Sequence, residues 1–441
     1  MIGTAIIGGL TCLSIVITVL IKPSISIKKV NIGLYWVVAL LGAILILAFG
    51  FVGGDKIVRG LCADNSINPL KIITLFISMT VLSIFLDELG LFKYMANFAL
   101  QKAKGSQHTM FFYLYAIVSI LTVFTSNDII ILTFTPFICH FCKNAEIDPL
   151  PYLFCEFIAA NTWSMMLVIG NPTNIYLATS FDISFFAYFK QMLIPTVFAG
   201  ITSLGVLLLI FWKKLKAPMC PKPMAVVIED KGALIIGVLH LAFCTLLLAI
   251  SSYIGFEMWY ISLGFALSLF VCVLIYSAVK KQQPKALGGC LKRAPYELIP
   301  FVISMFVIVL AFNDSGITEI FADFLGGKED ILIFGASSCF AANLVNNIPM
   351  SVLFGSVVGE LSGSVMPAAY ASIIGSNIGA FLTPIGALAG IMWSNILKEQ
   401  KVEFSFLTFV KYGVLLAIPT LLAAIGGLYL SFIAFPPFSA V

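Results

Sequence analysis

Two short polar segments interrupt long apolar runs in this sequence, and both contain side chains that could bind an ion or a polar solute. The first is TSND at residues 125–128, and the second is NNIP at residues 346–349. A carboxylate can carry a proton or bind a cation, and carboxamides bind polar solutes through hydrogen bonds. Such groups are costly in a lipid-facing helix, so we expect both segments to line a site inside the protein.

Asp128 is the sharpest candidate for ion coupling, because it is a carboxylate in the middle of an apolar stretch. It could carry a proton or bind sodium, and a buried ionisable residue at membrane depth is functional by default. The alternative is a structural role as the cap of a helix N-terminus, where Asp is favoured. Glu156, which lies in the next apolar stretch, is a second candidate for a proton site.

The other candidate ligands are neutral, and their hydroxyl and amide groups suit an uncharged hydroxylated solute or an oxyanion. The alternative is that some of them only cap helix ends. No basic residue lies among them, which argues against a di- or tricarboxylate substrate. Together with Asp128, the predicted substrate-binding residues are Asn127, Asn171, Thr173, Asn174, Asn346, Asn347, Asn377 and Thr383.

The composition places these residues in a membrane protein. Hydrophobic residues make up 60% of the 441 residues and charged residues 10%, and the mean hydropathy is +1.06. Soluble domains are about half apolar and about a quarter charged. We therefore predict an all-α integral membrane protein with about ten spanning helices. They lie near residues 2–22, 34–54, 68–89, 150–182, 185–212, 232–253, 256–277, 296–314, 366–397 and 406–433.

Two further apolar stretches, near 108–143 and 331–360, carry the polar segments in their middle and do not fit as single spans. We predict two re-entrant helical hairpins there, each followed by a helix broken at Gly and Pro. With this topology, 20 of the 25 Lys and Arg residues fall on one face, which the positive-inside rule assigns to the cytoplasm. Both termini are then outside and the protein is a multi-pass protein of the cell inner (plasma) membrane.

Landmarks recur in the same order in the two halves. The pair Asn127-Asp128 recurs 219 residues later as Asn346-Asn347, and Asn161 recurs 216 residues later as Asn377. Each half contains five spans and one hairpin, and because five is odd the second half is inverted. We predict a first inverted repeat at 1–213, a cytoplasmic linker at 214–231 and a second inverted repeat at 232–441. Inverted repeats with interrupted helices are typical of secondary transporters.

Three carboxylates precede a matched pair of glycines, Gly90 and Gly316. They belong either to a proton path or simply to span ends that face water, and we favour the second interpretation. They are Asp87, Glu88 and Asp314.

At these motifs the chain resembles the arsenite permeases (ArsB-like) of the ion transporter superfamily, which also contains NhaD-type sodium/proton antiporters and dicarboxylate and citrate carriers. The segment from Asn127-Asp128 to Thr135-Pro136 is similar to the family pattern N-D-x-x-x-x-x-x-T-P, and 346–350 is similar to N-N-L-P-M. Residues 375–389 resemble G-x-N-I-G…L-T-P-I-G-S-L-A. The likeness extends from the third span to the last. Two positions depart from it: Asn161, where the family usually has an acidic residue, and GNPTN at 170–174 in place of S-N-L-V-N.

The resemblance implies a scaffold and a transport domain, an elevator-like alternating-access motion and a homodimer. It also implies export of arsenite or antimonite, driven by proton antiport or by a soluble ATPase subunit. A sodium-coupled symporter of a dicarboxylate or another oxyanion is one alternative. A sodium/proton antiporter is another, although Asn347 stands where the second tip would need an Asp.

Other classes of function fit less well. The three histidines are scattered, no Ser-His-Asp arrangement is present, and no nucleotide-binding Gly-x-x-x-x-Gly-Lys motif occurs, so we predict no enzyme and no metal or cofactor. The basic residues are spread through loops, which argues against nucleic acid as a partner. Paired hairpins that close on a site favour a carrier over an open channel.

Overall fold

The structure is a computed structural model. It describes residues 1–436 apart from 23, 28–29, 65–67, 220–227, 327–329, 364 and 403–404. Residues 220–227 of the predicted linker at 214–231 therefore lie outside the described residues.

The first half of the chain is a series of helices with one small sheet. The sheet is an antiparallel pair of strands, β1 (Ser24–Ile27) and β2 (Val30–Gly33). The helices are α1 (Ile2–Ile21), α2 (Leu34–Ala48), α3 (Gly54–Cys62), α4 (Pro69–Glu88), α5 (Leu91–Ala103), α6 (Gln107–Phe124), α7 (Asn127–Ala145), α8 (Leu150–Trp163), the 3-10 turn η1 (Val168–Gly170), α9 (Pro172–Ser180) and α10 (Phe185–Phe211).

The second half repeats this order of helices, with the short helix α12 added and with no strand among its described residues. After a second 3-10 turn, η2 (Lys214–Lys216), its helices are α11 (Lys231–Ala249), α12 (Ser251–Ile254), α13 (Met258–Val279), α14 (Lys285–Arg293), α15 (Leu298–Asp314), α16 (Ile317–Leu325), α17 (Asp330–Val345), α18 (Asn347–Gly359), α19 (Val365–Gly379), α20 (Leu388–Glu399) and α21 (Phe406–Ala434).

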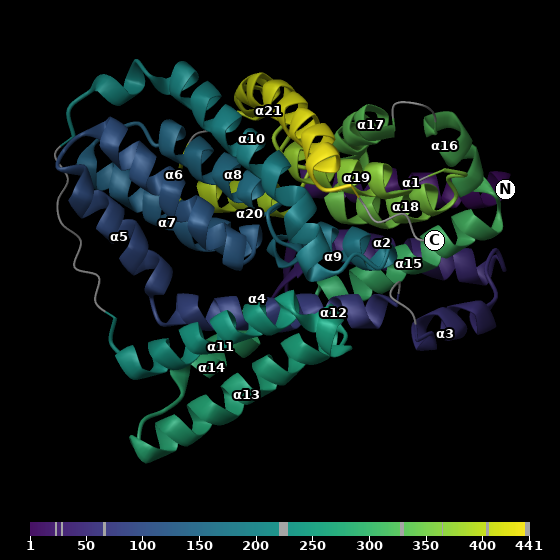
Figure 1. The fold of residues 1–441 in the computed structure, drawn as a ribbon, viewed down its shortest axis with the longest axis horizontal. Coiled ribbons are helices and arrows are strands. Elements are labelled where there is room, and N and C mark those ends of the chain that lie inside the picture. The colour runs from purple at the N-terminus through teal and green to yellow at the C-terminus, as the bar shows by residue number, and fades with distance from the viewer. Residues whose placement is uncertain are drawn as a thin grey trace.

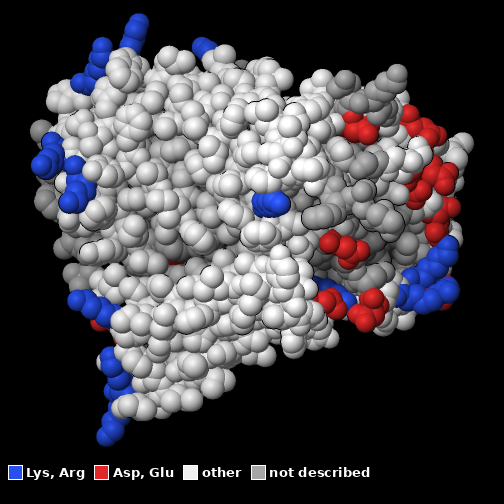
Figure 2. Space-filling view, in the orientation of Figure 1, with Lys and Arg blue, Asp and Glu red and all other residues white. Residues whose placement is uncertain are grey.

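Among the described residues, seven helical segments are long and apolar enough to cross a membrane: α4, α6, α10, α11, α13, the segment that contains α14 and α15, and α21. Shorter apolar helices are α1, α2, α17 and α18. Figure 2 shows mainly Lys and Arg at one end of the molecule and charges of both signs at the other, with a largely uncharged surface between them that an isolated basic group interrupts. This distribution fits a bilayer around the middle of a multi-pass membrane protein.

Both predicted hairpins and both broken helices are present. α6 and α7 meet at the TSND segment, and α17 and α18 meet at the NNIP segment. The first broken helix consists of α8, η1 and α9, and the second consists of α19 and α20 with a non-helical segment between them. Polar residues at these breaks release the backbone from regular helix bonding in the middle of apolar sequence.

Contacts between the two halves occur in matched pairs. α7 packs on α20 and α18 packs on α9, while α4 packs on α13 and α15 packs on α2. α10 and α21, the last helices of the two halves, lie side by side (Figure 1). An exchange of the two halves would produce these pairs, so the contacts support the repeat, and the boundaries at 213 and 232 stay predictions.

Some elements differ from the prediction. The helix expected at 34–54 ends at Ala48, and the chain then forms the separate helix α3. The helices α3, α14 and α16 are amphipathic, so a search for long apolar runs does not find them. The small β1–β2 sheet was also not predicted, because its short strands join two apolar helices.

Candidate functional site

The first hairpin tip places Asp128 in the first turn of α7. Ser126 is the N-cap of α7, and its hydroxyl accepts a hydrogen bond from the Asp128 amide at 3.2 Å. The interpretation of Asp128 as the cap is therefore wrong. Its carboxylate lies in the first turn of α7, where the helix dipole favours negative charge. The side chain is half-buried and accepts no hydrogen bond from the described residues.

Asn127, beside Asp128, ties the first tip to the broken helix of the same half. Its Nδ2 donates to Oδ1 of Asn161 in α8 at 3.0 Å. Asn161 in turn donates to the carbonyl of Phe157. Both asparagines are buried, so the tip is held against α8 by amide pairing in an apolar environment.

The second tip uses Asn346 and Asn347. Asn346 is the N-cap of α18, with a left-handed φ of 72°. Its Nδ2 donates to the carbonyl of Ile385, in the break between α19 and α20, at 2.9 Å. Asn347 matches Asp128 in the sequence repeat, but it is the first residue of α18, whereas Asp128 is the second residue of α7. Its buried Oδ1 has no hydrogen-bond partner among the described residues.

The breaks of the two halves are joined by a group of buried amides. Oδ1 of Asn377 accepts from Nδ2 of Asn171 at 2.8 Å and from the Ser164 hydroxyl at 3.0 Å. Nδ2 of Asn377 donates to Oδ1 of Asn174 at 2.7 Å and to the Ile373 carbonyl at 2.8 Å. The structure therefore brings three predicted ligands together, and the hydrogen bonds of Asn377 are all used within the protein.

Three hydroxyl groups behave differently. The Thr383 hydroxyl donates to Oδ1 of Asn343 at 2.6 Å. Asn343 was not predicted as a site residue, although it begins the segment NLVNN in the second hairpin. The hydroxyls of Thr173 and Ser376 are buried and have no partner. Ser376 was also missed, and its place beside Asn377 in the GSNIG motif is the signal that could have found it.

Glu156 is completely buried in α8. The Thr135 hydroxyl of α7 lies 2.9 Å and 3.1 Å from its two carboxylate oxygens. The ion pairs of the described residues involve neither Glu156 nor Asp128. Both carboxylates therefore lie in a region without a compensating cation, where a bound proton or metal cation would be stabilised.

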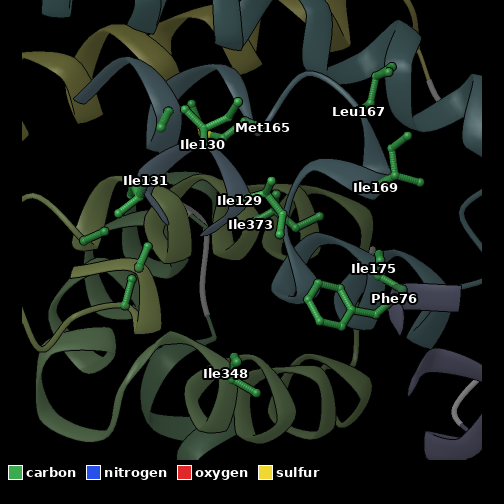
Figure 3. Packing of buried hydrophobic residues seen from close by; sticks show 14 of the residues in the cluster. Phe76, Ile129, Ile130, Ile131, Met165, Leu167, Ile169, Ile175, Ile348 and Ile373 are labelled. Carbon is green, nitrogen blue, oxygen red and sulfur yellow. The ribbon is translucent and has the colours of Figure 1, made fainter. Parts of the chain in front are cut away.

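Buried apolar side chains from the hairpins and broken helices lie close to one another in this region (Figure 3). Ile129, Ile130 and Ile131 follow Asp128 in α7, Ile373 precedes Asn377 in α19, and all four are buried. Hydrogen bonds are stronger in such an environment than in water, and unpaired groups are more costly. The unpaired hydroxyls and the Asp128 carboxylate are therefore the groups that a polar solute or ion would satisfy.

Comparison with known proteins identifies the family. A family model described as a citrate transporter matches residues 25–375. The chain belongs to this citrate transporter family. Such proteins are membrane transporters, so the chain is a multi-pass membrane protein that moves a small solute or ion.

The relatives of this family member include arsenical pumps. The arsenical pump membrane protein of Escherichia coli is 24% identical over 419 residues, which cover 91% of this chain and 94% of that protein. The putative arsenical pump membrane protein of Bacillus subtilis is 24% identical over 384 residues, which cover 79% and 85%. These matches confirm the resemblance to arsenite permeases.

A solved structure shares the fold. The YdaH transporter of Alcanivorax borkumensis, whose structure is described as having an unusual topology, matches with a TM-score of 0.55 and 14% identity over 98% of both chains. At this identity the match concerns the fold alone. It confirms that this citrate transporter family member has the helical architecture of a membrane transporter.

Proposed function

We propose that this chain exports arsenite or antimonite across the cell inner membrane by proton-coupled alternating access. The observation that carries the proposal is the Asp128 carboxylate, which begins α7 at the first tip and has no hydrogen bond or ion pair from the described residues. A carboxylate in this position can take up a proton on one side of the membrane and release it on the other.

Neutral hydrogen-bonding groups support a neutral substrate. Trivalent arsenic is present in neutral water as As(OH)3, whose hydroxyls both donate and accept hydrogen bonds. The side chains of Thr173, Ser376 and Asn347 contain buried oxygen atoms without partners, and each could bond to such a hydroxyl. The names of the bacterial relatives support the same substrate class.

Glu156 is proposed as a second proton site. It is buried, and its one described hydrogen-bonding side chain is the neutral hydroxyl of Thr135. Because Thr135 belongs to α7 and Glu156 to α8, a change in the charge of Glu156 would act directly on the packing of the first hairpin.

The description of the matching family supports a second candidate, a symporter that couples sodium to a carboxylate or another oxyanion. The positive ends of the helix dipoles at the starts of α7 and α18 could attract an anion, although the N-caps Ser126 and Asn346 already bond one amide in each first turn. A citrate carrier would have to balance several negative charges without Lys or Arg among the candidate residues, so we place this candidate second. A sodium/proton antiporter would use Asp128 as a sodium ligand.

The remaining features of the mechanism are proposals as well. They are an elevator-like motion of the hairpins, a homodimer, the inverted orientation of the two halves, and outside termini with a cytoplasmic central loop. The chain itself carries no nucleotide-binding motif, so any drive by ATP would come from a soluble partner subunit.

Uptake by everted vesicles or proteoliposomes would test the proposal. Arsenite, citrate and sulfate would be offered separately, first with an imposed proton gradient and then with a sodium gradient. We expect accumulation of arsenite that a protonophore abolishes and that Asp128→Asn loses. Sodium-dependent citrate or sulfate uptake without arsenite uptake would instead establish the symporter, and saturation of flux without any gradient dependence would indicate a passive pathway.

A further inference from the structure

Two amphipathic helices, α14 and α3, each contribute one basic side chain to an ion pair. The acidic partners lie at the end of a long helix in the other half of the chain. Arg293, in the last turn of α14, pairs with Asp87 at 2.6 Å and with Glu88 at 2.7 Å, at the end of α4. Lys56 of α3 bonds both carboxylate oxygens of Asp314, at the end of α15, at 2.9 Å and 2.8 Å. Each ion pair therefore connects the first half of the chain to the second.

Glycines bring both amphipathic helices close to their partners. A Cβ atom at Gly289 of α14 would collide with the carboxylate of Glu88, and a Cβ atom at Gly60 of α3 would collide with the ring of Phe306 in α15. The basic residue lies four positions from the glycine in each helix, although the order is reversed. In α14 the close packing and the charge pairing involve the same residue, Glu88, whereas in α3 the packing partner Phe306 lies eight positions before the paired Asp314.

Each paired carboxylate lies just before a glycine turn. Gly90 has a φ of 82° and Gly316 a φ of 71°, in the left-handed region that glycine adopts without strain. The Gly90 amide donates to the Asp87 carbonyl at 2.8 Å, and the Gly316 amide donates to the Asn313 carbonyl at 3.1 Å. At these turns α4 leads into α5 and α15 leads into α16.

The short helices after the turns pack against the hairpins. α5 contacts both α6 and α7, and α16 contacts both α17 and α18. A rotation of α5 or α16 about its glycine turn would therefore move the hairpin attached to it. The ion pairs lie on the other side of each turn, where the long helix ends.

The pair at α4 is the more buried of the two. The side chain of Asp87 is 5% exposed and that of Asp314 is 26% exposed. Oδ1 of Asp87 has no partner, so the charge of this carboxylate is balanced through Arg293. The interpretation of Asp87 as a span end that faces water is therefore wrong.

We propose that these ion pairs are positioning clamps for transport: they hold the ends of α4 and α15 still while α5 and α16 turn about Gly90 and Gly316. The inference rests on the proposed function, because it takes the hairpins to move during transport. Lys56 and Arg293 pair with the ends of α15 and α4, next to the turns that lead into α16 and α5. These ion pairs lie outside the candidate solute site.

Hydrogen exchange of the full chain in lipid nanodiscs tests the clamps without any solute. We expect Lys56→Glu to speed exchange in residues 315–320 by at least about tenfold and to leave 89–94 unchanged. Arg293→Ala should do the reverse. Arg59→Ala is the matched control, because Arg59 lies on α3 and pairs with Asp55 of the same helix, and it should change neither segment. Unchanged exchange at both turns in both clamp variants would overturn the proposal.

A charge exchange separates positioning from stability. Lys56→Glu should lower the maximal arsenite transport rate by about tenfold and leave KM within about twofold of the wild type. The double variant Lys56→Glu/Asp314→Lys restores the pair at a half-exposed site and should restore both the rate and the exchange protection. Restored protection without restored rate would show that the pair only stabilises the fold. A wild type that does not transport arsenite would contradict the proposed substrate, and hydrogen exchange would still decide the clamps.

Discussion

In the first hairpin the chain turns at Ser126 and begins α7 with Asn127 and Asp128, whereas in the second it turns at Asn346 and begins α18 with Asn347. Each tip bonds to the broken helix of its own half. Among the described residues, the Asp128 carboxylate of the first tip accepts no hydrogen bond, and Oδ1 of Asn347 in the second tip has no partner. The two tips, whose N-caps have a φ of −110° at Ser126 and 72° at Asn346, therefore offer a titratable group in the first hairpin and a neutral ligand in the second.

The matched asparagines of the broken helices also differ in their partners. Asn161 bonds to the first tip through Asn127, whereas Asn377 bonds across to the other half through Asn171 and Asn174. Equivalent positions in the two halves thus have different structural roles. Asn161 fixes the first hairpin to α8, and Asn377 connects the two halves. Sequence symmetry predicts where the polar groups gather but not how they share hydrogen bonds.

The largest effect is expected from Asp128→Asn, which gives the first tip the neutral side chain of the second. We expect proton-driven arsenite uptake to fall to background while the amount of protein in the membrane stays the same, because the 128 amide still bonds to Ser126. Vesicle uptake and membrane immunoblots measure both quantities. The double variant Asp128→Asn/Asn347→Asp should stay inactive, and recovery of uptake would show that the two tips are interchangeable.

Asn377→Ala should destabilise the fold more than Asn161→Ala. The first substitution removes the partner of Asn171, Asn174 and Ser164 together, and we expect a cost of about 2–3 kcal/mol because several buried groups lose bonds. Asn161→Ala removes fewer bonds and should cost about 1–2 kcal/mol. Thermal unfolding of the two purified variants compares them directly. Equal losses of stability would contradict the different roles that their hydrogen bonds indicate.

Glu156→Gln separates a proton site from a hydrogen-bond acceptor. The Gln carbonyl can still accept a bond from Thr135, so we expect little change in stability but a drop of about tenfold in proton-driven uptake. Thr135→Val is the complementary variant. It leaves the buried carboxylate of Glu156 without its hydrogen bond and should lower the free energy of unfolding by about 1–3 kcal/mol. Normal uptake by Glu156→Gln would show that Glu156 has only a structural role, as a hydrogen-bond acceptor for α7.

Much of this architecture can be predicted from the sequence, because its strongest features are violations of an apolar pattern. Polar and helix-breaking residues at 125–128, 170–174 and 346–349 identify both hairpin tips and the first break. The pairing of Arg293 with Asp87 cannot be predicted in this way, since the two residues lie 206 positions apart. Nor can sequence distinguish the saturated amide of Asn377 from the unpaired hydroxyl of Ser376 beside it.

The smallest effect concerns the first helices of the two halves. α11 begins at the N-cap Asp230, which accepts bonds from the amides of Gly232 and Ala233 and from the Tyr276 hydroxyl, whereas α1 has no side-chain cap. Burial raises the pKa of Asp230, but the hydrogen bonds from Tyr276 and Ala233 and the positive charge of Lys280 together outweigh it, so the pKa of this carboxyl is lowered.

Because the pKa of Asp230 is lower in the folded state, its contribution is complete above the unfolded pKa of about 3.9 and is lost as pH falls through the folded pKa. We expect Asp230→Ala to reduce stability by about 1 kcal/mol at pH 7. The difference from the wild type should shrink as the pH falls below about 4. Thermal unfolding of the wild type and the variant across this range measures it. A difference that is independent of pH would mean that Asp230 acts through packing rather than through its charge, and that the two first helices differ less than their caps indicate.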